Sequence, residues 1–201
     1  GTITIEQAVM NSCNPYMIHL ALELGNEKFA AYQSLFGFGK TTGIDLPGET
    51  MGIVYGNKMT TIDAACNSFG QTINVNMMQM MAAYCSIING GMLYQPHIIN
   101  GGMLYQPHIV KRIESANGEV VKENKATLVR QTVTMSTSKL LRRYLKSTVE
   151  TGTAKKVAVT GYSVAGKTGT AQKSPRSENK WLISFIGHAP ADNPKFDICN
   201  N

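Results

Sequence analysis

The stretch from Gly161 to Lys173 holds the residue types best suited to binding an anionic group. Lys167-Thr168-Gly169 lies at its centre, and the apolar run 181–187 follows a polar connection. Two strand-like segments joined in this way predict a hairpin. Glycine inside a strand often marks the close approach of a ligand or another backbone. A lysine, a threonine hydroxyl and backbone N–H groups on such a strand suit a carboxylate or a developing oxyanion, so the sequence predicts a substrate-binding edge.

The Lys-Thr-Gly tripeptide is weak evidence when taken alone. By chance it should occur in about one chain of this length in twenty. An ordinary exposed strand with a solvated lysine would show the same pattern. The interpretation therefore depends on which other residues accompany it.

Length and composition indicate one globular domain or a large piece of one. The chain has 201 residues, of which 43% are hydrophobic and 16% charged, and these values suit a chain with a packed core. No apolar run reaches the length that spans a bilayer, and no signal peptide opens the sequence. We therefore expect any membrane anchor of the intact protein to lie outside these residues.

Charge and cysteine usage argue against two common classes of site. The net charge is +6, but the densest basic run, 139–146, has helical periodicity with its basic residues on one side, which is typical of a solvated helix face rather than a nucleic-acid interface. The four cysteines are irregularly spaced, without a Cys-x-x-Cys or a nearby His pair, and give no support for a zinc site or a redox dithiol. They are Cys13, Cys66, Cys85 and Cys199.

Helices are expected over much of residues 4–90. Thr4 to Gln7 has capping-box form and opens a helix through Met10. Asn14 and Pro15 suit the cap and first residue of a second helix, which ends at Gly25, and a third follows Asn26. Further helices are expected near 61–67, from 76 to 90 and from 137 to about 152. The expected core positions are Met17, Ile18, Ala21, Leu22 and Leu24, then Phe29, Tyr32, Leu35 and Phe36, then Met77, Met80, Met81, Tyr84 and Ile87.

The remaining segments add loop and strand. Residues 41–57 are rich in Gly and Pro and predict a loop. Residues 110–121 predict two strands around an Asn117-Gly118 turn. Lys195-Phe196 resembles the start of a buried strand, yet the sequence turns polar at Asp197. Helices combined with antiparallel hairpins indicate the α+β class.

An eleven-residue segment is repeated directly and identically. Residues 88–98 and 99–109 have the same sequence. Two copies of this length cannot build a solenoid, so a tandem duplication or an error in the recorded sequence explains the repeat better than a function does. One copy should be an inserted loop, and His97 and His108 are poor catalytic candidates.

Several motifs together resemble the transpeptidase domain of class B penicillin-binding proteins, the enzymes that cross-link peptidoglycan in cell division and sporulation. The resemblance extends over residues 1–201 as a partial domain. Motifs in the right order are more specific than any one of them. They are 11–15 (Asn-Ser-Cys-Asn-Pro), 43–49 (Gly-Ile-Asp-Leu-Pro-Gly-Glu), 69–71 (Phe-Gly-Gln), 89–91 (Asn-Gly-Gly) before Pro96-His97, 152–154 (Gly-Thr-Ala) and 166–171 (Gly-Lys-Thr-Gly-Thr-Ala).

The resemblance implies a role for each site residue. The family works with Ser-x-x-Lys, Ser-x-Asn and Lys-Thr/Ser-Gly motifs. Ser12 matches the serine of the second motif, which relays protons with the lysines, and Asn14 matches the amide that holds the acyl donor. Lys167 and Thr168, ahead of Gly169, match the groups that hold the substrate carboxylate. The N–H of Thr170 would supply half of the oxyanion hole.

Two of these residues also have structural interpretations. Asn14 is well placed as the N-cap before Pro15. The hydroxyl of Ser12 could bond to backbone groups at a helix end.

The Ser-x-x-Lys motif does not precede Ser12, where the family has it. The sequence matches it at Ser136–Lys139 and Ser177–Lys180, but about one such match is expected by chance. Both follow the second motif, Ser136 suits a helix cap, and Ser177 lies in the hairpin connection. We reject both and expect the nucleophile on a helix before Gly1.

The resemblance therefore predicts an incomplete penicillin-binding or serine β-lactamase-like fold, with an antiparallel sheet flanked by helices. The implied activity is a peptidoglycan D,D-transpeptidase that acts through an acyl-serine, with these residues alone inactive. It implies stem peptides and β-lactams as ligands, no metal or organic cofactor, no nucleic acid, and division or sporulation proteins as partners. The implied location is the extracytoplasmic face of the bacterial membrane. A β-lactam-binding sensor and a serine β-lactamase remain as alternatives, distinguished by assays of cross-linking and of β-lactam hydrolysis.

Overall fold

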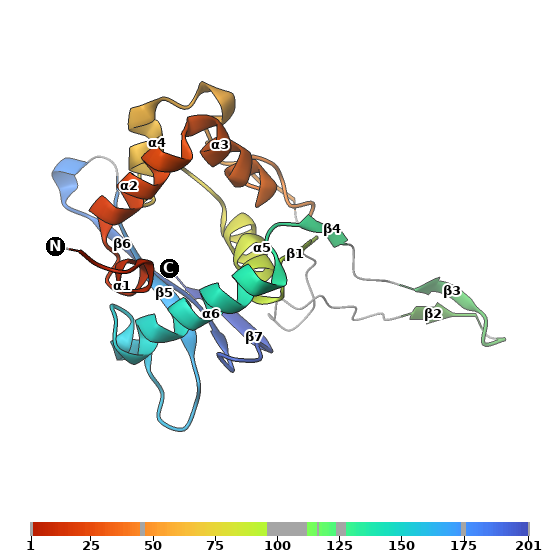
Figure 1. Ribbon diagram of the computed structural model, residues 1–201. Coiled ribbons are helices and arrows are strands. Elements are labelled where there is room, and N and C mark those ends of the chain that lie inside the picture. The colour runs from red at the N-terminus through yellow and green to blue at the C-terminus, as the bar shows by residue number, and fades with distance from the viewer. Residues whose placement is uncertain are drawn as a thin grey trace.

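A computed structural model describes residues 2–44, 47–95, 112–115, 117–123, 128–173 and 176–200. These residues form an α+β arrangement of helices and antiparallel strands (Figure 1). The α-helices are α1 (Ile5–Met10), α2 (Asn14–Leu24), α3 (Asn26–Leu35), α4 (Thr61–Asn67), α5 (Met77–Ile88) and α6 (Met135–Glu150). The strands are β1 (Met92–Tyr94), β2 (Arg112–Glu114), β3 (Val120–Glu123), β4 (Leu128–Gln131), β5 (Ala165–Gln172), β6 (Trp181–Ala189) and β7 (Phe196–Asn200). The short 3₁₀-helices are η1 (Gly56–Lys58), η2 (Lys155–Val157) and η3 (Arg176–Glu178).

The main sheet contains β5, β6 and β7 in that order, all antiparallel. Strand β5 lies at the edge of the described sheet and pairs with β6 along its whole length. Glycine is needed where the strands pair at Gly166 and Gly187, because a Cβ on either would lie 2.5 Å from the Phe185 ring. The ring of Phe185 therefore lies directly over the backbone of β5 and β6.

Helix α6 connects this sheet to the N-terminal helix. The hydroxyl of Thr148 donates a hydrogen bond to the carbonyl of Gly166 on β5. On another side of α6, Glu6 of α1 accepts a hydrogen bond from Ser147 at 2.7 Å and lies 3.5 Å from Arg143. Figure 1 shows α6 running across the β5–β7 sheet with α1 at its end. Helix α6 thus fixes α1 relative to β5.

A buried hydrogen bond joins helix α5 to strand β6. The Tyr84 hydroxyl lies 2.7 Å from Nδ1 of His188 on β6, and Nε2 of that ring lies 3.2 Å from the carbonyl of Ala191. A carbonyl only accepts, so Nε2 carries the hydrogen and Nδ1 accepts from Tyr84. Burial lowers the pKa of His188 and raises that of Tyr84. Both groups are therefore held in their neutral forms.

The helices α2, α3 and α4 group at the opposite end of the molecule (Figure 1). Ala30, Met59 and Ala64 form a small buried cluster there, with Phe29 packed against it. A buried hydrogen bond of 3.0 Å joins Gln33 of α3 to Asn67 of α4.

The loop between α3 and α4 is held by one carboxylate and one amide. Glu49 accepts hydrogen bonds from the backbone and hydroxyl of Thr42 at 2.8 and 2.7 Å, and from the N–H of Gly43 at 3.1 Å. The buried Gln79 of α5 donates to the carbonyls of Lys40 and Met51. The capping box of α5, formed by Asn76 and Gln79, therefore also anchors this loop.

Most helix predictions are confirmed, including the capping box at Thr4 and the helices near 61–67 and 76–90. The hairpin of the Lys-Thr-Gly strand and the Asn117-Gly118 turn are also confirmed. The pairing of β1 with β4 was not anticipated, because three- and four-residue strands carry too little periodicity to recognise. Part of the repeat, including His97 and His108, lies outside the described residues.

Several expected core and cap positions were wrong. Leu22, Tyr32, Met77 and Met80 are exposed, whereas Met81 and Tyr84 are buried. Helix α6 begins at Met135 with Thr134 as its cap, so Ser136 is not the cap. Strand β7 does form despite its polar residues, because backbone pairing with β6 does not require apolar side chains.

One face of the sheet carries exposed apolar side chains. The pairing of β6 with β7 places Trp181, Ile183, Phe196 and Ile198 on the same face, and each is more than half exposed. No described helix covers these side chains. That the chain by itself is poorly soluble stays a prediction.

We expect Glu49→Gln to lower the free energy of unfolding by about 1–2 kcal/mol near neutral pH, because a carboxylate that receives several hydrogen bonds is replaced by an amide that can accept fewer. Burial opposes ionisation, but the bonds from Thr42, Gly43 and Asn76 outweigh it and lower the pKa of Glu49 overall. The stabilisation is therefore present above the pKa of the unfolded chain, about 4.3, and disappears as the pH falls through the folded value.

Urea unfolding at pH 7 and at pH 3 would measure this difference. Glu119→Gln, at an exposed position on the β2–β3 turn, is the control and should have little effect at either pH. An equal loss for Glu49→Gln at both values would contradict the electrostatic explanation.

Candidate active site

Ser12 lies in a sharp turn between α1 and α2. The turn is closed by backbone hydrogen bonds from Ser12 N–H to Val9 (3.2 Å) and from Cys13 N–H to Ala8 (2.9 Å). Ser12 has a φ of +52°, a left-handed conformation that costs a non-glycine residue about 1–2 kcal/mol. This conformation places an exposed hydroxyl beside β5. Such strain is often found at functional sites.

Lys167 of β5 lies against this hydroxyl. Its ammonium donates hydrogen bonds to Oγ of Ser12 and to the carbonyl of Thr168, the latter at 2.9 Å. The two partners Lys167 and Ser12 are 155 positions apart in the chain. Burial of the amine lowers the pKa of Lys167, since the charged form loses hydration. The fold therefore brings together a hydroxyl and a lysine that holds its proton less tightly than an ordinary one.

Thr153 completes the group and was not predicted as a site residue. Its Oγ1 lies 3.5 Å from Oγ of Ser12 and 3.3 Å from Oγ1 of Thr168. The backbone beside it packs closely, because a Cβ on Gly152 would lie 2.5 Å from the carbonyl oxygen of Met10. Residues 152–154 belong to the motifs that resemble the family, but no local sequence signal indicates that the Thr153 hydroxyl reaches both Ser12 and Thr168.

The outer edge of β5 presents backbone donors. The carbonyl of Gly166 accepts from Thr148 of α6 and so points away from β6. In an antiparallel strand the N–H and carbonyl of one residue point to the same side, and this side alternates along the strand. The N–H groups of Thr168 and Thr170 therefore point to the open edge. The Thr170 side chain is itself exposed.

Asn14 and Gly169 complete the predicted set. Asn14 is exposed in the first turn of α2, two residues after Ser12. The alternative interpretation of Asn14 as the N-cap of α2 is wrong. Cys13 is the N-cap, and its side chain makes no capping hydrogen bond. Gly169 packs directly against β6, since a Cβ there would lie 2.6 Å from Oγ of Ser184.

The two rejected serines lie in other settings. Ser136 is in the first turn of α6, where its hydroxyl lies 2.8 Å from that of Thr134. Ser177 belongs to the exposed 3₁₀-helix between β5 and β6. Among the described hydrogen bonds, neither serine contacts Lys139 or Lys180, so the geometry gives neither one an activating partner.

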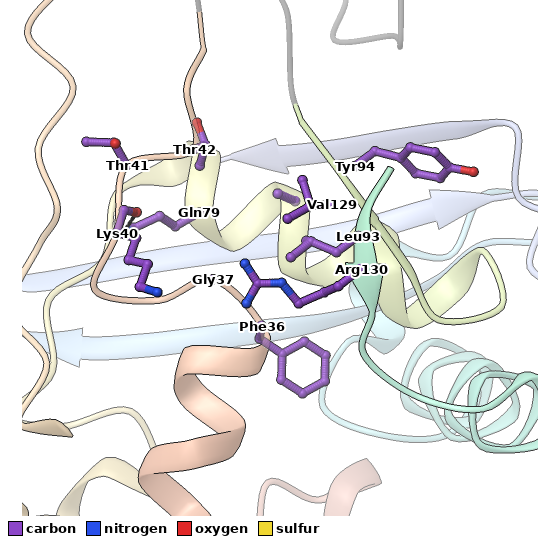
Figure 2. Close-up of a pocket in the computed structure, with 11 residues that line it drawn as sticks. Phe36, Gly37, Lys40, Thr41, Thr42, Gln79, Leu93, Tyr94, Val129 and Arg130 are labelled. Carbon is purple, nitrogen blue, oxygen red and sulfur yellow. Dashed lines mark hydrogen bonds between the residues drawn. The ribbon is translucent and has the colours of Figure 1, made fainter. Parts of the chain in front are cut away.

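A separate pocket lies away from this group, between the end of α3, α5 and the β1–β4 pair. Its volume is about 80 Å³, and Lys40, Leu93 and Arg130 are among the lining residues drawn in Figure 2. Arg130 is already bonded to the carbonyl of Ser34 at 3.1 Å. None of the predicted site residues lines it. The candidate site is therefore an open strand edge and not this pocket.

Across the described ranges, no three His, Cys, Asp or Glu side chains are grouped so that they could hold a metal ion. None of the described helices has the combination of length and apolar character that crossing a bilayer requires.

Comparison with known proteins identifies the family. The model of the penicillin-binding protein transpeptidase domain matches residues 1–101 and, in a second segment, residues 97–201. The chain belongs to the penicillin-binding protein transpeptidase family. The two matched segments of this transpeptidase domain meet inside the repeated stretch 88–109; the duplication itself stays a prediction.

Individual relatives of this transpeptidase domain agree with that assignment. Stage V sporulation protein D of Bacillus subtilis is 39% identical over 98% of the chain, and peptidoglycan D,D-transpeptidase MrdA of Acinetobacter baumannii is 28% identical over 98%. Penicillin-binding protein 3 of Mycobacterium tuberculosis, solved in complex with ampicillin, superposes with a TM-score of 0.80 at 28% identity over 98% of the chain. The fold prediction is thus confirmed.

The transpeptidase-family chain spans only part of each relative. It covers 30% of the sporulation protein, 31% of MrdA and 44% of the solved mycobacterial chain.

We expect Ser12→Gly to be more stable than Ser12→Ala by about 1 kcal/mol, because both remove the hydroxyl but only glycine relieves the left-handed backbone. The free energies of unfolding of the two variants, measured by urea titration, test this. Ser163→Gly, at an exposed position outside the left-handed region, is the comparison and should show no gain over Ser163→Ala. Equal stability of the two Ser12 variants would show that the turn relaxes without cost.

Proposed function

We propose that these residues form the substrate-binding side of a serine-type peptidoglycan D,D-transpeptidase. The observation that carries the proposal is the hydrogen bond between Lys167 and Ser12. It joins the Ser-x-Asn and Lys-Thr-Gly motifs beside a strand edge with outward N–H groups. The family assignment supports the reaction type, since the matching model is that of a transpeptidase domain.

The reaction is an acyl transfer through a serine ester. The nucleophilic serine attacks the penultimate D-alanyl carbonyl of a stem peptide, the peptide bond breaks, and D-alanine leaves with the transferred proton. An amine of a neighbouring strand then attacks the ester, forms the cross-link and releases the serine. The nucleophile belongs to a Ser-x-x-Lys motif, which does not precede Ser12 in the 201 residues. We therefore expect these residues alone to form no acyl-enzyme.

Each residue has a role in this scheme. Ser12 and Lys167 pass a proton between the nucleophile and the leaving group, which the lowered pKa of Lys167 favours. The amide of Asn14 holds the acyl donor. Thr168 and Lys167 bind the terminal carboxylate, and Gly169 lets the peptide backbone approach. The N–H of Thr170 stabilises the oxyanion.

The same site would bind β-lactams, which resemble the acyl donor. The mycobacterial neighbour solved with ampicillin supports this ligand class. The proposed location is the extracytoplasmic face of the bacterial membrane, where peptidoglycan is built. The name of the Bacillus relative favours a sporulation role over a division role and sporulation proteins as partners.

The function is tested by incubating the intact protein that contains these residues with benzylpenicillin and measuring its mass. We expect one stoichiometric adduct on a serine outside this 201-residue segment, and no adduct on the isolated segment. Lys167→Ala should slow adduct formation about 100-fold or more, because a positioned charge and proton carrier is lost. Lys155→Ala, on an exposed lysine of η2, is the control and should react like wild type. Rapid hydrolysis of the drug would indicate a β-lactamase, and an adduct without peptide cross-linking would indicate a sensor.

The role of the Thr170 N–H allows a second test with proline. Thr170→Pro removes a donor that points to the open edge, so the hairpin should persist while acylation falls about 100-fold or more. Ala171→Pro removes a donor that faces β6 and should disrupt the hairpin. Circular dichroism melting and acylation rates would separate the two outcomes. Normal acylation by Thr170→Pro would exclude this N–H from the oxyanion hole.

A further inference from the structure

We propose that Thr153 is a positioning residue of this site, whose hydroxyl joins those of Ser12 and Thr168 and sets the direction in which Ser12 passes its proton. The proposal rests on the proposed acyl-transfer function. It adds a third chain segment, the turn after α6, to the two motifs described above.

The contacts around Thr153 form a closed ring. Lys167 donates to Oγ of Ser12 and to the carbonyl of Thr168. Thr153 closes the other side, at 3.5 Å from Ser12 and 3.3 Å from Thr168. These two distances are long for hydroxyl pairs, and contacts of this kind often tighten when substrate binds. Among the described contacts of the Ser12 hydroxyl, removal of Thr153 would leave the one with Lys167.

The backbone holds Thr153 in this position. Its N–H donates to the carbonyl of Met10 at 3.1 Å, two residues before Ser12. The next residue, Ala154, is buried and donates to the carbonyl of Thr148 at 3.0 Å. On the preceding side, Gly152 leaves no space for a side chain against Met10. The turn is thus tied both to the segment that carries Ser12 and to the helix that contacts β5.

The donors and acceptors available at Ser12 and Thr153 indicate what the Thr153 hydroxyl does. A hydroxyl has one hydrogen and two lone pairs. One lone pair of Ser12 accepts from the Lys167 ammonium, so its hydrogen is directed elsewhere. Oγ1 of Thr153 accepts from Thr168 and keeps a second lone pair that can receive this hydrogen. Thr153 therefore holds the Ser12 hydroxyl with its hydrogen turned away from Lys167, so that Oγ of Ser12 stays an acceptor toward the lysine.

The test uses the intact protein containing these residues and the rate of its acylation by benzylpenicillin. Thr153→Val keeps the branched shape without the hydroxyl and should lower the second-order rate constant by about 10- to 100-fold. Thr153→Ser should restore most of the rate. Thr151→Val is the matched control, because the Thr151 hydroxyl contacts Met10 and Ser147 rather than the site. If Thr153→Val melts at a lower temperature than the wild-type protein, Thr153→Ala is used in its place.

A double-mutant cycle separates positioning from a general structural effect. If Thr153 acts through Ser12, then Thr153→Val should cost little further rate in a Ser12→Ala background. The same loss in both backgrounds would overturn the proposal. So would a Thr153→Val rate equal to that of wild type.

Titration of the Lys167 amine tests the role of Thr153 without relying on acylation. Failure of the wild-type protein to react with the drug would refute the function. The Lys167 amine can then be titrated by NMR in the same variants. Without Thr153 the Ser12 hydrogen turns toward the neutral amine, so Thr153→Val should lower the Lys167 pKa while Thr151→Val leaves it unchanged. An unshifted titration in Thr153→Val overturns the positioning role.

Discussion

The packing of α6 between α1 and β5 is the constraint on which the candidate site depends. On one side, Thr148 bonds the carbonyl of Gly166 in the edge strand. On the other, the close approach of Gly152 to Met10 brings α1 against the end of α6. Ser12 follows directly from α1, and Lys167 follows directly from Gly166. The position of α6 therefore determines the geometry of the Lys167–Ser12 contact, although α6 contains neither residue.

The same packing explains why the site is built from unfavourable features. Ser12 has a left-handed backbone, and Lys167 loses hydration by burial. Each costs stability, and neither could be maintained by its own segment. Close-packed neighbours such as Gly152 and Gly166 hold them in place, because these positions leave no room for relaxation. Both unfavourable features thus coincide at the proposed site.

The two edges of strand β5 differ in their hydrogen bonding. One edge of β5 is fully paired with β6, whereas the opposite edge is contacted by Thr148 at Gly166 and then opens from Thr168 onward. An open edge with alternating N–H groups can pair with an extended peptide, as an added strand does. Serine, lysine and threonine side chains gather where that pairing would begin. The separate pocket in Figure 2 is lined by none of the predicted site residues.

The sequence by itself determined the fold class, most helix boundaries, the hairpin that carries Lys167, and the family. These follow from local signals, such as the capping box at Thr4 and the glycines of β5, and from motif order. Tertiary structure decided the exposure of Tyr32 and Met77, because helical periodicity gives a face but not what covers it. It also decided the role assigned to Thr153. The hydroxyl of Thr153 meets Ser12 across 141 positions of chain, and such contacts depend on how α1, α6 and β5 pack, which no local pattern records.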